Sequence, residues 1–82
     1  MDRKATEIRI PDLGEVDEVR IVGWLVPSGS RVELDQDVLE VETEKTTFVI
    51  PAPAGGRLTH GETAGGDVVR RGDVVGVIEA GD

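Results

Sequence analysis

The chain has 82 residues and no cysteine, which limits it to one small domain without disulfides or thiolate metal ligands. Its formal net charge is −8 with scattered basic residues, which argues against nucleic acid and anionic membranes as partners. No apolar run approaches the roughly 20 residues that span a bilayer, and the first residues do not resemble a signal peptide. We expect a cytoplasmic location, with the mitochondrial matrix as the other fitting compartment, and we expect the isolated domain to be a monomer.

Short alternating apolar runs predict an all-β domain. The first strands are expected over Glu7–Ile10 and Val19–Val26, with an acidic loop between them. Further strands bounded by Gly, Pro or Asp turns follow over Arg31–Glu33, Val38–Glu42, Thr46–Ile50, Gly56–Thr59, Asp67–Val69 and Val74–Ile78. We expect residues 1–5 to be a flexible terminus, residues 6–80 to form a single domain, and residues 81–82 to end it where a linker would start.

The two halves of the chain resemble each other. Val32 and Val68 are each followed by Asp-Val five residues later and by Val three residues further on. Gly23-Trp24-Leu25 and Gly56-Arg57-Leu58 precede the two copies. The repeat predicts two similar four-stranded halves that pack as two sheets, with quasi-two-fold symmetry between them. That symmetry would place the turn at Lys45 at one end of the domain and both termini at the other.

One lysine stands at a polar corner between two of the expected strands. Val38–Glu42 enters this corner, Thr47–Ile50 leaves it, and Glu44 and Lys45 are its outermost residues. The pattern predicts a β-hairpin with a primary amine at its tip. Two interpretations stay open on these residues alone. Lys45 is either a charged side chain on a solvated turn, as most surface Glu–Lys pairs are, or a lysine that an enzyme acylates.

The residues around the corner favour acylation of Lys45. Glu42-Thr43-Glu44-Lys45-Thr46, with the flanking segments 26–32 and 50–56 and the start Glu7–Glu15, resembles the lipoyl domains of 2-oxoacid dehydrogenase complexes. These belong to the biotinyl/lipoyl attachment domain family, here of the dihydrolipoamide acyltransferase type. The resemblance runs from about Glu7 to Glu79. It implies a flattened barrel of two four-stranded antiparallel sheets.

The resemblance also implies the site residues. Lys45 takes the position that carries lipoic acid in amide linkage, and the flanking recognition positions are Glu44, where the family usually has Asp, and Thr46, where it usually has Ala. The loop at 14–17 is one residue shorter than in many members and lies near the lysine in the family fold. It supplies three candidate partner contacts, Glu15, Val16 and Asp17. Val49 is a fourth, because it faces outward if Phe48 and Ile50 face the core.

As the resemblance implies, the domain is a non-catalytic carrier whose lipoyl arm shuttles acyl groups and reducing equivalents. A lipoate ligase or lipoyl transferase would attach the cofactor. A thiamine-dependent 2-oxoacid decarboxylase, an acyltransferase core and a dihydrolipoyl dehydrogenase would then use the arm in turn. The absence of cysteine suits this role, because the chain cannot scramble the cofactor's disulfide.

Two other functions compete with this one. A biotinyl carrier shares the fold, but its lysine usually lies between methionines, and the only methionine here is Met1. An unmodified lipoyl-like module used for assembly is the second. An enzyme is disfavoured, because a single histidine, His60, can build neither a triad nor a histidine metal site. We expect His60 to have a role in a turn next to Gly61, and Trp24 to be in the core or half-buried.

Overall fold

The structure, a computed structural model, describes residues 5–14 and 16–80. It contains eight strands: β1 (Ala5–Arg9), β2 (Glu18–Trp24), β3 (Arg31–Val32), β4 (Asp37–Glu42), β5 (Thr47–Pro51), β6 (Gly56–His60), β7 (Val68–Arg70) and β8 (Val74–Glu79). Every expected strand is present, and the all-β class is confirmed. In these residues no helix is long and apolar enough to cross a membrane. Ala5 was expected in a flexible terminus but instead pairs with Glu79 at the start of β1.

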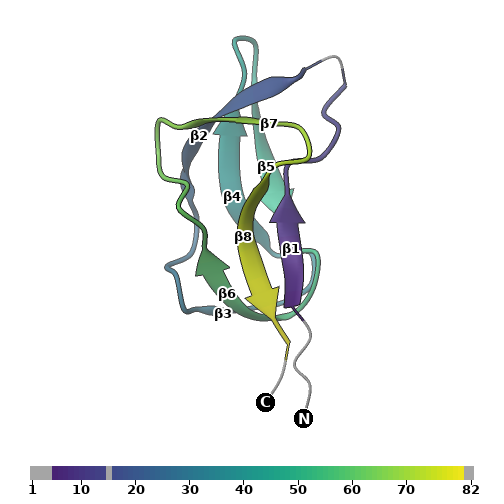
Figure 1. The fold of residues 1–82 in the computed structure, drawn as a ribbon, viewed down its shortest axis with the longest axis vertical. Helices are drawn as coiled ribbons and strands as arrows, with labels where there is room; N and C mark the ends of the chain where they lie inside the picture. The colour runs from purple at the N-terminus through teal and green to yellow at the C-terminus, as the bar shows by residue number, and fades with distance from the viewer. Residues whose placement is uncertain (1–4, 15, 81–82) are drawn as a thin grey trace.

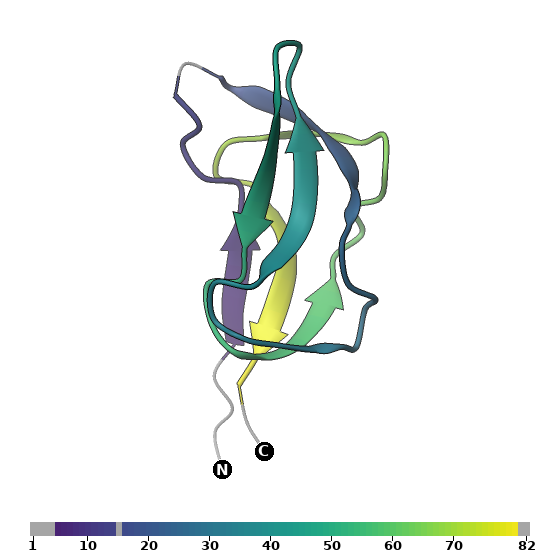
Figure 2. The ribbon, with the colours of Figure 1, turned by 180° about the vertical axis from the view of Figure 1, so that it is seen from behind.

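The strands form two four-stranded antiparallel sheets, in the orders β1-β8-β6-β3 and β5-β4-β2-β7. The molecule is elongated, with principal extents of 43 × 21 × 20 Å. Figure 1 shows the β4–β5 hairpin at one end of the long axis, with the start of β1 and the end of β8 toward the other. Seen from behind, the same hairpin rises above the rest of its sheet (Figure 2). The predicted placement of the Lys45 turn opposite the termini is therefore confirmed.

Aliphatic side chains from both sheets form one core. Strand β2 shows how alternation produces it, because Val19 and Ile21 are buried while Glu18 and Arg20 face the solvent. Burying one such side chain fully contributes about 1.5–3 kcal/mol. The buried hydrophobic residues are Ile8, Ile10, Val19, Ile21, Val32, Val38, Leu39, Val41, Ile50, Ala52, Leu58, Val75 and Ile78. Every strand except β7 contributes a buried side chain, and Val69 of β7 packs against the same core, so both sheets share one interior.

Backbone hydrogen bonds reveal the quasi-two-fold relation between the halves. Asp35 and Gly72, which are 37 positions apart, both adopt positive φ, at 71° and 89°. The N–H of Asp35 donates to the carbonyl of Ala52 at 2.9 Å, and the N–H of Gly72 donates to the carbonyl of Ile10 at 2.8 Å. The turn between β3 and β4 is thus bonded to the residue that follows β5, and the turn between β7 and β8 is bonded in the same way to the residue that follows β1.

The repeat exists, but the register predicted for it is wrong by one residue. The sequence match paired Val38 with Val74, yet Val38 is fully buried and Val74 is 42% exposed. The second pairing, of Leu58 with Leu25, is wrong by four residues, because Leu58 lies opposite Ile78 as Ile21 lies opposite Val41; Leu58 is fully buried and Leu25 is 47% exposed. Val75, which is fully buried, is the structural equivalent of Val38. Side chains on a strand alternate between faces, so a slip of one residue exchanges core positions for surface ones.

Trp24 and His60 stack on each other, with ring centroids 4.3 Å apart and planes inclined by 10°. The indole N–H donates to the carbonyl of Thr63 at 3.3 Å, and Nε2 of His60 lies 2.8 Å from the carbonyl oxygen of Val26. The expected half-buried position of Trp24 is confirmed. The turn role expected for His60 is wrong, because His60 is the last residue of β6 and its ring fixes Trp24.

We expect His60→Ala to lower the free energy of unfolding by about 1–3 kcal/mol, because it removes a stacked pair and a partly buried hydrogen bond. Urea unfolding followed by far-ultraviolet circular dichroism measures this change. The control is Thr59→Ala, one residue earlier on the exposed face of β6, with an expected change of about 0.5 kcal/mol or less. Equal losses in the two variants would show that the stack adds nothing beyond strand propensity.

Candidate functional site

The β4–β5 hairpin forms as the sequence predicts. Val41 pairs with Phe48 and Glu42 with Thr47, which leaves a short connection from Thr43 to Thr46. Phe48 packs against the core and Ile50 is buried, whereas Val49 points outward. Glu44 and Lys45 are the two central residues of the connection, and both are exposed. The amine of Lys45 therefore stands at the tip of a turn whose two strands are anchored in the core.

The turn is held by the side chain of Thr43. Its N–H donates to the carbonyl of Thr46 at 2.8 Å. Its hydroxyl Oγ1 accepts the N–H of Lys45 and the N–H of Thr46, each at 3.1 Å, and lies 3.2 Å from the carbonyl oxygen of Thr46, to which it can donate. One hydroxyl thus uses its donor and both acceptor sites, which is its full hydrogen-bonding capacity.

The side-chain hydrogen bonds of Thr43 take the place of the positive-φ backbone conformation that usually closes a tight hairpin. The favoured two-residue hairpin turns require positive φ at one or both central residues. Among the described residues other than glycine, only Asp35 has positive φ, so Glu44 and Lys45 do not. The sequence prediction placed the hairpin correctly but assigned no role to Thr43. A threonine two residues before the exposed lysine was the available signal, because such hydroxyls bond to backbone amides two residues on.

We expect Thr43→Val to loosen the tip, because it keeps the side-chain shape but removes every hydrogen bond made by Oγ1. The expected loss of stability is about 1 kcal/mol. Amide hydrogen exchange measured by NMR should become faster at Lys45 and Thr46 than in the parent protein. Thr47→Val is the matched control, since the side chain of Thr47 is exposed at the start of β5 and forms no hydrogen bond in the described residues. Unchanged exchange at Lys45 in Thr43→Val would contradict this role.

The amine of Lys45 is available for reaction. Across residues 5–14 and 16–80, no ion pair or hydrogen bond engages its ammonium group. A groove beside its side chain is lined by Val16, Glu18, Thr43 and Glu44. The groove brings the loop between β1 and β2 next to the hairpin tip, although these segments are far apart in the sequence.

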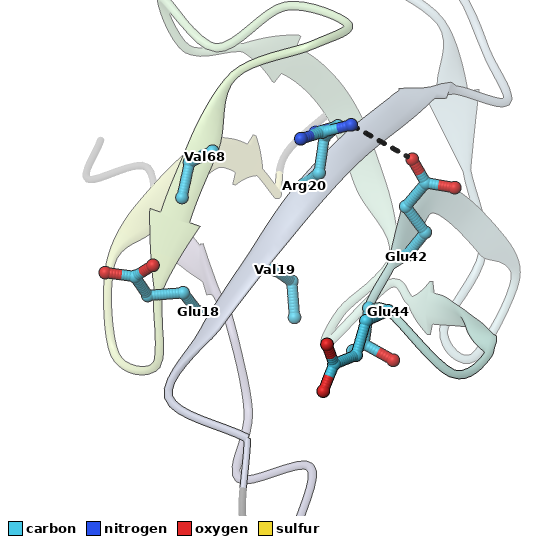
Figure 3. Close-up of a pocket in the computed structure, with 7 residues that line it drawn as sticks. Glu18, Val19, Arg20, Glu42, Glu44 and Val68 are labelled. Carbon is cyan, nitrogen blue, oxygen red and sulfur yellow. Dashed lines mark ion pairs between the residues drawn. The ribbon is translucent and has the colours of Figure 1, made fainter.

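The outer face of the hairpin's sheet is acidic next to the tip. Figure 3 shows Glu18, Glu42 and Glu44 around a shallow groove that also includes Val68. Arg20 crosses this groove, and its Nη1 lies 3.9 Å from Oε2 of Glu42. A partner that approaches Lys45 from this side meets carboxylates and one partly neutralised arginine.

The candidate partner contacts fall in two places. Val16 packs against the core and lines the groove beside Lys45, and Asp17 is exposed and pairs with Arg71 at 3.5 Å. Glu15 lies outside the described residues. Val49 is 49% exposed on β5, opposite Glu40. Their role in partner binding stays a prediction.

The described residues contain no group of three or more His, Cys, Asp or Glu side chains that could hold a metal ion. Among these residues, the fold and the site together form a small barrel that presents the exposed amine of Lys45 on a hydrogen-bonded turn.

Comparison with known proteins identifies the family. A family model described as "Biotin-requiring enzyme", covering biotin and lipoyl attachment, matches residues 6–78. The chain therefore belongs to the biotinyl/lipoyl attachment domain family, as the residues around Lys45 indicated.

Two of the proteins that the chain is similar to are dihydrolipoyllysine-residue acyltransferase components. The chain is 39% identical over 77 residues to the dihydrolipoyllysine-residue succinyltransferase component of the 2-oxoglutarate dehydrogenase complex of Bartonella vinsonii, a match covering 93% of this chain and 19% of that protein. It is 38% identical over 79 residues to the acetyltransferase component of the pyruvate dehydrogenase complex of Staphylococcus aureus, covering 95% of this chain and 18% of that protein. The chain thus spans about a fifth of the length of these relatives.

A solved structure agrees with the assignment. The lipoyl domain of the 2-oxoglutarate dehydrogenase complex of Azotobacter vinelandii superposes with a TM-score of 0.74 at 25% identity. The match covers 93% of this chain and 98% of that domain. The expected fold of two four-stranded antiparallel sheets is confirmed by this likeness.

Proposed function

We propose that this chain is a lipoyl carrier domain that serves a 2-oxoacid dehydrogenase complex, with lipoic acid attached through an amide bond to Nζ of Lys45. One observation carries the proposal: in a member of this family, Lys45 stands free at the tip of a core-anchored hairpin, at the end of the barrel opposite the termini. When bound, the cofactor would supply a dithiolane that accepts an acyl group and two electrons.

The surrounding residues fit this cofactor. Amide formation removes the positive charge of Lys45, and no ion pair in the described residues has to be broken for it. Glu44 and Thr46 flank the amine on the fixed turn, where a ligase would recognise them. The chain has no thiol that could exchange with the cofactor's disulfide.

The role proposed for the domain is delivery rather than catalysis. Its partners would be a lipoate ligase or lipoyl transferase, a thiamine-dependent decarboxylase, an acyltransferase core and a dihydrolipoyl dehydrogenase. Tethering raises the effective concentration of the arm at each active site without any new contact. The carboxylates around the tip would favour partner surfaces that are basic at the entrance of the active site.

A biotin cofactor is disfavoured at this site. The family model covers both cofactors, but Glu44 and Thr46 occupy the positions at which biotin sites usually have methionine. The relatives reported above are lipoyllysine acyltransferases.

The decisive test compares the loading of lipoate and of biotin in two parallel incubations. The domain is incubated with ATP and lipoate plus a lipoate ligase, or with ATP and biotin plus a biotin ligase, and analysed by intact mass and peptide mapping. We expect one lipoyl group on Lys45, none on Lys4, and no biotin. Biotin on Lys45, or an unmodified domain under both conditions, would refute the proposal.

A further inference from the structure

We propose that Arg71 is a positioning residue, which holds the loop between β1 and β2 beside Lys45 in the conformation that a partner decarboxylase recognises. The inference rests on the proposed function for the identity of the partner. It concerns a residue far along the chain from both the lysine and the loop, in the turn between β7 and β8.

Arg71 joins two parts of this loop. Its Nη1 lies 3.6 Å from Oδ1 of Asp12, and its Nη2 lies 3.5 Å from Oδ1 of Asp17. Its backbone N–H also donates to the carbonyl of Asp17 at 3.0 Å. Oδ1 of Asp12 in turn accepts the N–H of Gly14 at 3.0 Å. One side chain therefore draws together the residues on either side of the loop's tip.

The turn that carries Arg71 is itself fixed to the start of the loop. The N–H of Gly72 donates to the carbonyl of Ile10 at 2.8 Å, and the N–H of Ile10 donates to the carbonyl of Asp73 at 3.0 Å. Nη1 of Arg9 donates to the carbonyl of Gly72 at 2.8 Å. The guanidinium of Arg71 is thus presented from a rigid base, which lowers the entropy lost when it bridges two carboxylates.

The bridged loop forms one wall of the groove at Lys45. Val16, next to Asp17, packs against the core and faces Glu44 and Lys45 across that groove. Releasing Asp17 would free Val16 to move and would change the surface next to the amine. Surface ion pairs are individually weak. What gives this one a role is that a single guanidinium pairs with both Asp12 and Asp17, in a loop whose other anchors in the described residues include the core contacts of Leu13 and Val16 and a few backbone bonds.

The test compares Arg71→Ala with Arg57→Ala, which removes the same charge from β6, opposite Glu79 at the end of β8. In the unlipoylated domain, we expect Arg71→Ala to speed amide exchange at Gly14 and Val16 by about fivefold, while Val41 in the core is unchanged. Arg57→Ala should leave both loop amides unchanged.

The second measurement uses the lipoylated domain as the substrate of a thiamine-dependent decarboxylase. We expect Arg71→Ala to raise KM about fivefold at unchanged kcat, because the loop acts in recognition and not in the reaction. Arg71→Lys should recover part of the loss, since an ammonium pairs with one aspartate at a time. Arg57→Ala should match the parent protein.

The outcomes separate the two proposals. Unchanged loop exchange in Arg71→Ala, or an unchanged KM with a parent domain that is lipoylated and acylated, would overturn the positioning role. A fall in kcat with no rise in KM would also overturn it. A parent domain that takes up no lipoate would instead refute the proposed function, and the exchange measurement would still decide whether Arg71 holds the loop.

Discussion

Lys45→Ala is expected to abolish lipoylation and acyl transfer while leaving the fold intact. Lys4 is the chain's other lysine, so no second amine stands on a comparable turn in the described residues. The turn itself is held by Thr43 and by backbone bonds, and the ammonium of Lys45 takes no part in them. Removing an exposed side chain of this kind should change stability by about 0.5 kcal/mol or less.

Intact mass after incubation with lipoate and ligase measures the loss, and thermal unfolding measures the fold. Lys45→Arg is the matched control for charge, because it keeps a cation at the tip but supplies no amine that forms the amide. Both variants should remain unmodified with thermal midpoints close to the parent. Residual lipoylation of Lys45→Ala would place the attachment site elsewhere, and a large fall in its midpoint would reveal a structural role for the lysine.

Gly56→Ala is expected to be the most destabilising single substitution of a glycine in the barrel. Gly56 has a φ of +151° at the start of β6, and an added Cβ would lie 2.3 Å from the carbonyl oxygen of Glu79 and 3.0 Å from Cγ2 of Ile78. The nearest atom is backbone in the neighbouring strand β8, which cannot move without breaking its pairing with β1 and β6. Overpacking and strain together should cost about 3 kcal/mol or more.

Thermal unfolding tests this, with an expected fall in the midpoint of more than about 12 °C for a domain of this size. Gly29→Ala is the control, since Gly29 also has positive φ, at +93°, but has no atom within 4 Å of a built Cβ. It should lose only about 1 kcal/mol, from backbone strain alone. Equal effects in the two variants would mean that positive φ, and not the approach to Glu79, sets the cost.

Local alternation predicted the strands well because burial on one face imposes a period of two on each strand. It predicted the outward side chain of Val49 and the hairpin at Lys45 for the same reason. The register of the repeat failed because Asp-Val recurs at both 37 and 73, whereas burial equates Val38 with Val75. A valine on a core face and a valine on an outer face cannot be told apart by residue type.

The sequence patterns could not predict contacts between segments that are far apart in the chain. The stack of Trp24 on His60 joins residues 36 positions apart and depends on which strands share an end of the barrel. The pairing of Arg71 with Asp12 is of the same kind. Both contacts depend on how the two sheets face each other. The charge or aromaticity of a short stretch of sequence does not determine that arrangement, so it could not predict these contacts.

The opposed placement of the Lys45 hairpin and the chain ends has a mechanical consequence. In the quasi-symmetric halves, the pair Ala5 and Glu79 occupies the place that Thr47 and Glu42 hold beside the turn of the hairpin. A linker joined to either terminus would therefore leave from the far side of a rigid body whose long axis is 43 Å. If the domain carries the proposed lipoyl group on Lys45 and pivots about such a linker, the length of the domain would add to the radius that the cofactor sweeps, so the cofactor arm itself would need less reach.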